Sequence, residues 1–123
     1  MRVLVCEDQD AIRQMITTLV GSSGHEVVGV STGAKAVELA STEPFDILLL
    51  DLMLPGQLDG FQVCERLRGQ DSTKSLPIFI ISAMDDPDSR AKAKGAGATD
   101  FFGKPFRPLE LLKVIQGVAA SRR

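Results

Sequence analysis

The sequence predicts an α/β fold in which a mainly parallel sheet is covered by helices on both faces. Short apolar runs alternate along the chain with segments whose apolar residues recur at the spacing of a helix. The run at 47–50 shows no polar alternation, which is typical of a strand buried on both faces. Alternating strand and helix units of this kind indicate βαβ connections with right-handed crossovers.

The five expected strands are short. They cover residues 3–6, 26–30, 47–50, 76–81 and 99–102. Pro77 is tolerated because it stands near the beginning of the fourth strand. Alternation along the fifth strand is expected to send one of Phe101 and Phe102 inward and the other outward.

The five expected helices follow the strands. They cover residues 12–20, 34–40, 60–67, 87–96 and 109–118. Asp8 or Asp10 can cap the first helix, and Pro44 closes the second. The fourth helix is weaker, because it is rich in alanine, lysine and arginine and has little apolar stripe. Its Lys92 and Lys94 side chains are expected on a solvated face.

The composition is that of an ordinary globular protein, and we expect one domain over residues 1–123. Hydrophobic residues make up 44% and charged residues 24%. A net charge of −2, with no basic block except Arg122-Arg123, argues against direct nucleic-acid binding. No apolar run approaches the roughly 20 residues that span a bilayer. The N-terminus enters a strand at once, so we expect a cytoplasmic protein without a signal peptide or membrane contact.

Two cysteines, Cys6 and Cys64, lie inside apolar segments. Neither has a neighbour at the short spacing of a metal site or a redox motif. We expect both to be reduced core residues, as is usual in a cytosolic protein. A disulfide between them is the less favoured alternative.

Acidic side chains follow two of the apolar runs. Glu7 and Asp8 follow the first expected strand, and Asp51 follows the third. If these strands are neighbours, the three carboxylates converge at the carboxyl edge of the sheet, where ligands bind in open α/β folds. Carboxylates so close repel one another unless a cation lies among them. Without a nearby histidine or thiolate, this set favours Mg²⁺ over Zn²⁺.

A lysine and a hydroxyl extend this set. Lys104 follows the fifth expected strand and Ser82 follows the fourth. Acids, Mg²⁺ and a lysine together describe a phosphoryl-transfer site, where positioning and charge neutralisation do most of the catalysis. Taken singly, Asp51 and Ser82 could merely cap turns, and the acidic pair could merely start a helix. A cluster of all five groups favours the functional interpretation.

The motifs along the chain resemble those of the receiver domain of bacterial two-component response regulators, in particular the chemotaxis response regulators. The resemblance covers essentially the whole chain, and its marks together are highly specific. They are Glu7-Asp8, Asp51 with Pro55 and Asp59-Gly60, Ser82-Ala83, the run at 95–101 and Lys104-Pro105-Phe106. The resemblance implies a flavodoxin-like (βα)5 doubly wound sheet with strand order 2-1-3-4-5.

The resemblance also implies a role for each acid. Asp51 would accept a phosphoryl group from a histidine kinase. Asp8 and Asp51 would bind Mg²⁺ directly, together with the main-chain carbonyl of Met53, and Glu7 would hold the ion largely through water. Lys104 would pair with Asp51 and then with a phosphoryl oxygen.

Three further positions take roles from the same resemblance. Ser82 would donate its hydroxyl to the phosphoryl group and draw the following loop inward. Phe101 stands at the switch aromatic of the family. The bond between Lys104 and Pro105 is expected to be cis.

The expected function is a phosphorylatable signalling switch rather than an enzyme in the usual sense, limited to self-phosphorylation with Mg²⁺ and slow autodephosphorylation. Its expected partners are a sensor histidine kinase or phosphotransfer protein, and a downstream protein or a covalently linked output domain. A homodimer could form through the surface of helix 87–96, strand 99–102 and helix 109–118. An interaction module of the same fold that never carries phosphate is the first alternative. A small metal-dependent phosphatase is the second, which Met53 opposes because it replaces a second aspartate.

The sequence departs from the family pattern in two places. Three residues, Gly56-Gln57-Leu58, separate Pro55 from Asp59 where the family usually has two. Phe101 lacks the hydroxyl of the common tyrosine. Apart from these departures, Met53 and Met84 flank the site with apolar side chains, so we expect slow self-dephosphorylation.

Overall fold

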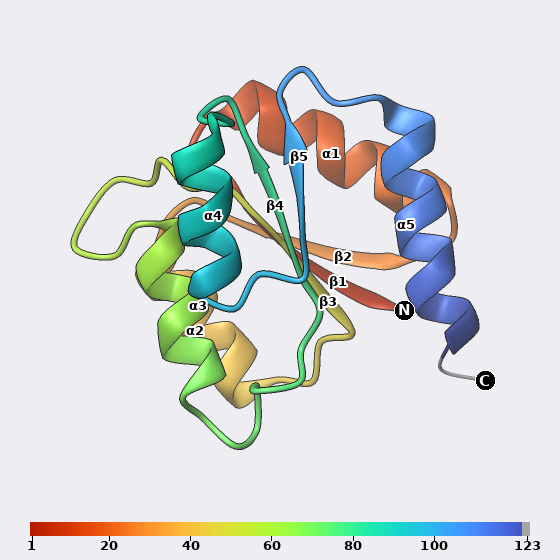
Figure 1. Ribbon diagram of the computed structural model, residues 1–123. Helices are drawn as coiled ribbons and strands as arrows, with labels where there is room; N and C mark the ends of the chain where they lie inside the picture. Colours follow the sequence, from red (N-terminus) through yellow and green to blue (C-terminus); the bar gives the residue numbers. More distant parts are fainter. Residues whose placement is uncertain (122–123) are drawn as a thin grey trace.

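The computed structural model describes residues 1–121 as a five-stranded parallel sheet between two layers of helices (Figure 1). The strands are β1 (Arg2–Cys6), β2 (Glu26–Val30), β3 (Ile47–Leu50), β4 (Ile78–Ser82) and β5 (Asp100–Gly103). Their order across the sheet is β2-β1-β3-β4-β5, and every neighbouring pair is parallel. The predicted fold class and strand order are confirmed.

The helices divide between the two faces of the sheet. They are α1 (Asp10–Ser22), α2 (Gly33–Thr42), α3 (Gly60–Arg68), α4 (Pro87–Gly95) and α5 (Pro108–Ser121). Helices α1 and α5 cover one face, and α2, α3 and α4 cover the other (Figure 1). None of these helices, within residues 1–121, has the length and apolar character to cross a membrane. The Arg122-Arg123 pair lies outside the described residues.

Strand β3 shows why the sequence lacks polar alternation there. Leu48 and Leu50 belong to the core between the sheet and helices α2 to α4. Ile47 and Leu49 belong to the core on the opposite side, with α1 and α5. All four side chains are at most 1% exposed, so every position of the strand needs an apolar residue.

The same double covering corrects the expectation for β5. Phe101 packs against the core on the α2 to α4 side, and Phe102 packs against the core on the α1 and α5 side. Both rings are half-buried, so neither side chain of the pair faces solvent as an outward position would. The two side chains do alternate between the faces of the sheet, but helices cover both faces, so both rings are packed.

One local prediction, the cap of α1, was wrong. The residue that caps α1 is Gln9, and its side chain makes no capping hydrogen bond. Asp10 instead pairs with Arg13 at 2.5 Å, and Asp8 lies with other carboxylates after β1. Lys92 and Lys94 are both exposed, as expected, and the Lys92 ammonium also lies 4.3 Å from the centre of the Phe61 ring.

Both cysteines are free and buried, as expected. Burial raises the pKa of the Cys6 thiol to about 12, with nearby carboxylates adding to the effect. Burial likewise raises the pKa of Cys64 to about 12. Neither thiol forms the reactive thiolate at neutral pH, so both act as small apolar core residues.

The start of α3 fixes the loop that follows Asp51. Asp59 and Gln62 form a reciprocal capping box, with two hydrogen bonds of 2.9 Å. The Gly60 N–H donates to the Leu52 carbonyl at 2.9 Å. A Cβ atom at Gly60 would lie 2.6 Å from Leu52 Cα, so only glycine lets the helix approach this closely.

The longer connection before α3 is accommodated at the surface. Gly56 adopts a φ of +88°, a left-handed conformation that favours glycine. Leu58 is half-buried and packs against the core on the α2 and α3 side. The additional residue lies in this surface connection, downstream of Met53.

Replacing Gly60 with alanine is expected to lower the free energy of unfolding by about 1–3 kcal/mol, because the added methyl group overlaps backbone that cannot move aside. Gly117→Ala in the exposed middle of α5 is the matched control, since nothing lies within 4 Å of its Cβ position. It should stabilise the protein by roughly 0.5–1 kcal/mol. Urea unfolding of both variants provides the measurement, and equal effects would contradict the close packing at Gly60.

Candidate active site

Three carboxylates meet at the carboxyl edge of the sheet. Strands β1 and β3 are neighbours with Cys6 opposite Leu50, so the residues that follow them emerge side by side. The Asp51 N–H donates to the Cys6 carbonyl at 3.0 Å, which extends this pairing by one residue. One oxygen each from Glu7, Asp8 and Asp51 lies within 4.8 Å of the others. The three acids converge as the sequence predicted.

The acids differ in their access to water. Glu7 is 2% exposed and Asp51 is 6% exposed, whereas Asp8 is exposed. Two carboxylates are thus largely withdrawn from solvent, and the third leaves the cluster open on one side. Buried carboxylates at this separation need a positive charge nearby to remain ionised.

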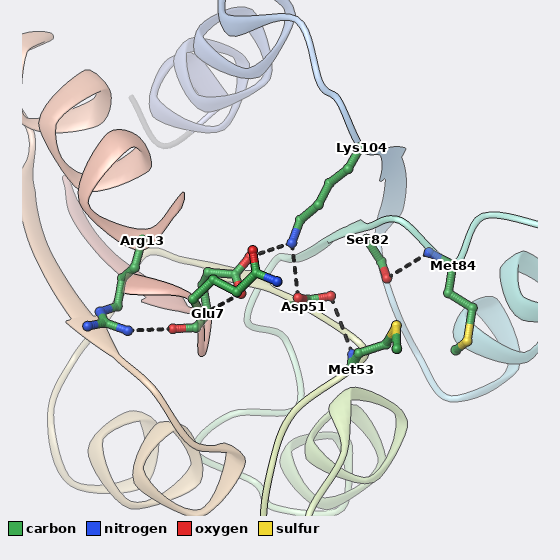
Figure 2. Close-up of polar contacts among 8 residues, drawn as sticks. Glu7, Arg13, Asp51, Met53, Ser82, Met84 and Lys104 are labelled. Atoms are coloured by element: carbon green, nitrogen blue, oxygen red, sulfur yellow. Dashed lines mark hydrogen bonds and ion pairs between the residues drawn. The ribbon is translucent and has the colours of Figure 1, made fainter. Parts of the chain in front are cut away.

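Lys104 supplies that positive charge. Its ammonium donates to Asp51 Oδ2 at 3.0 Å and also to Glu7 Oε1 (Figure 2). The end of β5 brings it there, because Ser82 pairs with Gly103 and the Lys104 N–H donates to the Ser82 carbonyl at 2.9 Å. The peptide bond after Lys104, to Pro105, is cis, as the resemblance implied.

This geometry determines the direction of the pKa shifts of Glu7 and Lys104. Burial raises the pKa of Glu7, while the Lys104 ammonium and the Gln9 N–H at 3.1 Å act in the opposite direction. For Lys104, burial alone would lower the pKa, but the Glu7 and Asp51 carboxylates outweigh it and the pKa is raised. Lys104 therefore stays protonated at neutral pH, next to Asp51.

Asp51 keeps acceptor capacity for a further ligand. Its Oδ2 accepts from Lys104, and its Oδ1 accepts from the Met53 N–H at 3.3 Å. A carboxylate offers about four lone-pair positions, so these two bonds leave room for a cation or an electrophile. The Met53 side chain is 61% exposed, and it leaves the site open beside Asp51.

Ser82 presents a hydroxyl from the end of β4. The residue is fully buried, and its Oγ accepts from the Met84 N–H at 3.2 Å (Figure 2). Among residues 1–121, no hydrogen bond uses the proton of this hydroxyl as donor. That proton is available for an acceptor oxygen placed at the site.

Two features of the site were not predicted. Glu7 was expected near the metal alone, but it also pairs with Lys104, and no local pattern links residues so far apart in the chain. Arg13 was given no role, although its guanidinium donates to the Glu7 carbonyl at 2.8 Å (Figure 2). This bond ties the first turn of α1 to the acidic segment, and no sequence signal distinguishes it.

The donor set favours a hard cation. All three candidate ligands are carboxylates. Such oxygen ligands suit Mg²⁺ or Ca²⁺ rather than the thiophilic metals. A carboxylate with free lone pairs, a charged lysine and an available hydroxyl proton at one sheet edge can accept and stabilise a phosphoryl group.

Comparisons with known proteins agree with this arrangement. The family model for the response regulator receiver domain matches residues 3–116. Protein PilH of Pseudomonas aeruginosa is 32% identical over 120 residues, which are 98% of this chain and 98% of that protein. The chain spans about half the length of several other curated relatives, which are named as transcriptional regulators or response regulators.

Two solved structures show the same likeness in three dimensions. The chemotaxis protein CheY4 of Vibrio cholerae superposes with a TM-score of 0.88 at 32% identity, over 95% of this chain and 97% of that chain. The receiver domain of the sensor histidine kinase PA1611 from Pseudomonas aeruginosa PAO1 superposes with a TM-score of 0.87 at 30% identity, over 94% and 93%. That structure has a magnesium ion coordinated in its active site cleft.

Replacing Lys104 with methionine is expected to lower the free energy of unfolding near neutral pH by about 1–3 kcal/mol, because two buried carboxylates lose their counter-ion. Without the ammonium, the pKa of Glu7 rises further above its unfolded value. A carboxyl group with a raised native pKa stabilises the fold at low pH, and this contribution is lost as the pH rises through that pKa. The deficit should therefore be smaller at about pH 5 than at about pH 7.5.

Lys113→Met on α5 provides the control for this variant. Lys113 is exposed and makes no ion pair among the described residues. Urea unfolding at the two pH values, followed by circular dichroism, measures both proteins. Equal losses in the two variants, or a Lys104 deficit that grows as the pH falls, would contradict the proposed charge balance.

Proposed function

Because the chain belongs to the response regulator receiver domain family, we propose that it is a phospho-acceptor switch of a two-component phosphorelay. The observation that carries this proposal is the Asp51 carboxylate, held by Lys104 at 3.0 Å in a cluster with two further acids. Glu7 also pairs with Lys104, but Asp51 is the acceptor because it follows β3, the strand that neighbours β4 and its terminal Ser82. The family relationship supports the switch in general, and the geometry supports this assignment of roles.

The acidic cluster fits a magnesium ion. Asp8 and Asp51 would bind it directly, together with the main-chain carbonyl of Met53, and Glu7 would hold it largely through water. Three observations support magnesium over zinc: the donors are all oxygens, the cluster is open on the side of Asp8, and the PA1611 receiver domain has a magnesium ion in its active site cleft. When bound, the ion supplies charge neutralisation for phosphoryl transfer.

Phosphoryl transfer forms one bond at Asp51 and breaks one in the donor. A carboxylate oxygen attacks phosphorus, and the bond from phosphorus to the donor's histidine nitrogen, or to the oxygen of a small phosphodonor, breaks. Lys104 then binds a phosphoryl oxygen, and Ser82 donates its available hydroxyl proton to another.

The new contacts supply the switch. The Met84 N–H is bonded to Ser82 Oγ at 3.2 Å, so a change at the hydroxyl is passed to the loop that follows β4. An acyl phosphate adds charge and acceptor oxygens that bias such an element. Phe101 on β5, which lies on the same side as α4, is the aromatic residue that responds.

The partners follow from the same proposal. A sensor histidine kinase or a phosphotransfer protein supplies the phosphoryl group. Output passes to a downstream protein, as the near full-length match to PilH favours, or to a covalently linked domain, as the half-length matches favour. The surface formed by α4, β5 and α5 is the proposed face for output or for a homodimer.

Incubation with acetyl phosphate and Mg²⁺ tests the assignment. We expect the intact mass to rise by one phosphoryl group in the wild type and not in Asp51→Asn, which keeps the shape of the side chain but loses its nucleophilic charge. Omitting Mg²⁺ should abolish the gain. A wild type that stays unmodified, with small donors and with kinases alike, would favour an interaction module that carries no phosphate.

Self-dephosphorylation is expected to be slow, because Met53 and Met84 cannot position a water molecule for attack on the phosphoryl group. The double variant Met53→Asn, Met84→Glu should shorten the lifetime of the phosphoprotein severalfold. Leu109→Asn, a polar change at an 80% exposed position on α5, is the control and should leave it unchanged. The decay of the phosphorylated mass after removal of the donor gives the rate, and equal lifetimes for all three proteins would refute the role of the methionines.

A further inference from the structure

Helix α4 is attached to the domain by few buried contacts. Of its nine residues, Ala93 alone is buried. Two of its cations lie over aromatic rings: Lys92 Nζ is 4.3 Å from the centre of Phe61, and Arg90 Cζ is 4.6 Å from the centre of Phe101. For a helix with so little buried surface, these contacts are a large part of what fixes its position.

Arg90 also binds the loop that precedes its helix. Its Nε donates to the Asp85 carbonyl at 3.1 Å, and its Nη2 lies 3.9 Å from Asp85 Oδ2. The Asp85 carboxylate in turn lies against β5, where a Cβ on Gly103 would overlap it. One guanidinium therefore joins the loop after β4 to the ring of Phe101.

The loop that Arg90 holds is directly connected to the phosphoryl-binding hydroxyl. Met84 N–H bonds to Ser82 Oγ at 3.2 Å, and Asp85 N–H bonds to the Ala83 carbonyl at 3.1 Å. These short-range bonds connect the end of β4 to Asp85. A rearrangement of Ser82 toward a phosphoryl group would therefore act on Asp85 and on its contacts with Arg90.

The Phe101 ring is not locked by dense packing on its outer side. Arg90 and Phe101 line a pocket of about 300 Å³ between α4 and β5. The ring is half-buried, so the guanidinium supplies a main contact on its open side. Loss of that contact would let the ring move at little cost.

We propose that Arg90 is a positioning residue for the switch: it holds the loop after β4 and the Phe101 ring in their unphosphorylated arrangement, and so opposes activation. This inference rests on the proposed phospho-acceptor function. The Arg90 contacts are partly exposed, so their removal should favour the activated state by about two- to fivefold, the range typical of an exposed cation–π contact.

The test is the affinity for beryllofluoride, an analogue of the phosphoryl group, in the presence of Mg²⁺. Calorimetry suits the measurement because the chain contains no tryptophan or tyrosine. Arg90→Gln should bind about two- to fivefold more tightly than the wild type. Lys94→Gln is the matched control: it removes one positive charge from the same helix and pocket, where no ring contact is found among the described residues.

A double-mutant cycle separates positioning from a general effect on the fold. In a Phe101→Leu background the effect of Arg90→Gln should shrink, because the ring that the guanidinium contacts is gone. In the wild-type background, Arg90→Lys should remain closer to the wild type, since it keeps a cation at the ring.

The outcomes also separate this inference from the function on which it rests. If the wild type binds beryllofluoride but Arg90→Gln matches Lys94→Gln, or binds more weakly, the role of Arg90 is refuted and the proposed function stands. An effect of Arg90→Gln that is undiminished in Phe101→Leu refutes the ring contact as its basis. If the wild type does not bind beryllofluoride with Mg²⁺, the proposed function fails and this inference fails with it.

Discussion

The ammonium of Lys104 between two buried carboxylates is the interaction on which the site depends. Glu7 and Asp51 are almost entirely withdrawn from water, and carboxylates in that position tend to become protonated. The Lys104 ammonium gives both carboxylates a positive partner, and it lies 3.0 Å from Asp51 Oδ2. Under the proposed function, the same cation would compensate the charge of a phosphoryl group on Asp51.

The sheet makes this interaction possible by its strand order. The neighbouring strands β1 and β3 place their terminal acids side by side, and β4 lies between β3 and β5. The lysine therefore reaches across the end of β4, where Ser82 is located, to contact the acids. A parallel arrangement is required, because only then do all these strand ends lie at one edge.

The sequence was sufficient to predict the strands and helices, which have periodic patterns, and the polar residues that directly follow the strands. Apolar runs and helical spacing gave the elements, and the acids at the strand ends gave the cluster around Asp51. It was not sufficient for contacts that depend on side-chain direction in three dimensions. The bond from Lys104 to Glu7, the failure of Asp8 to cap α1, and the position of Arg90 over Phe101 are of this kind. The composition of α4 predicted a helix with little apolar surface, but it could not predict which of its cations contacts an aromatic ring.

Strand β5 lies at the outer edge of the sheet and pairs with β4 alone. The acids belong to strands that are paired on both sides, so their relative positions are set by the interior of the sheet. Lys104, in contrast, follows the edge strand and reaches the acids from there. A shift of this edge strand would therefore reach the acids first through the lysine, while the interior strands kept the acids in register.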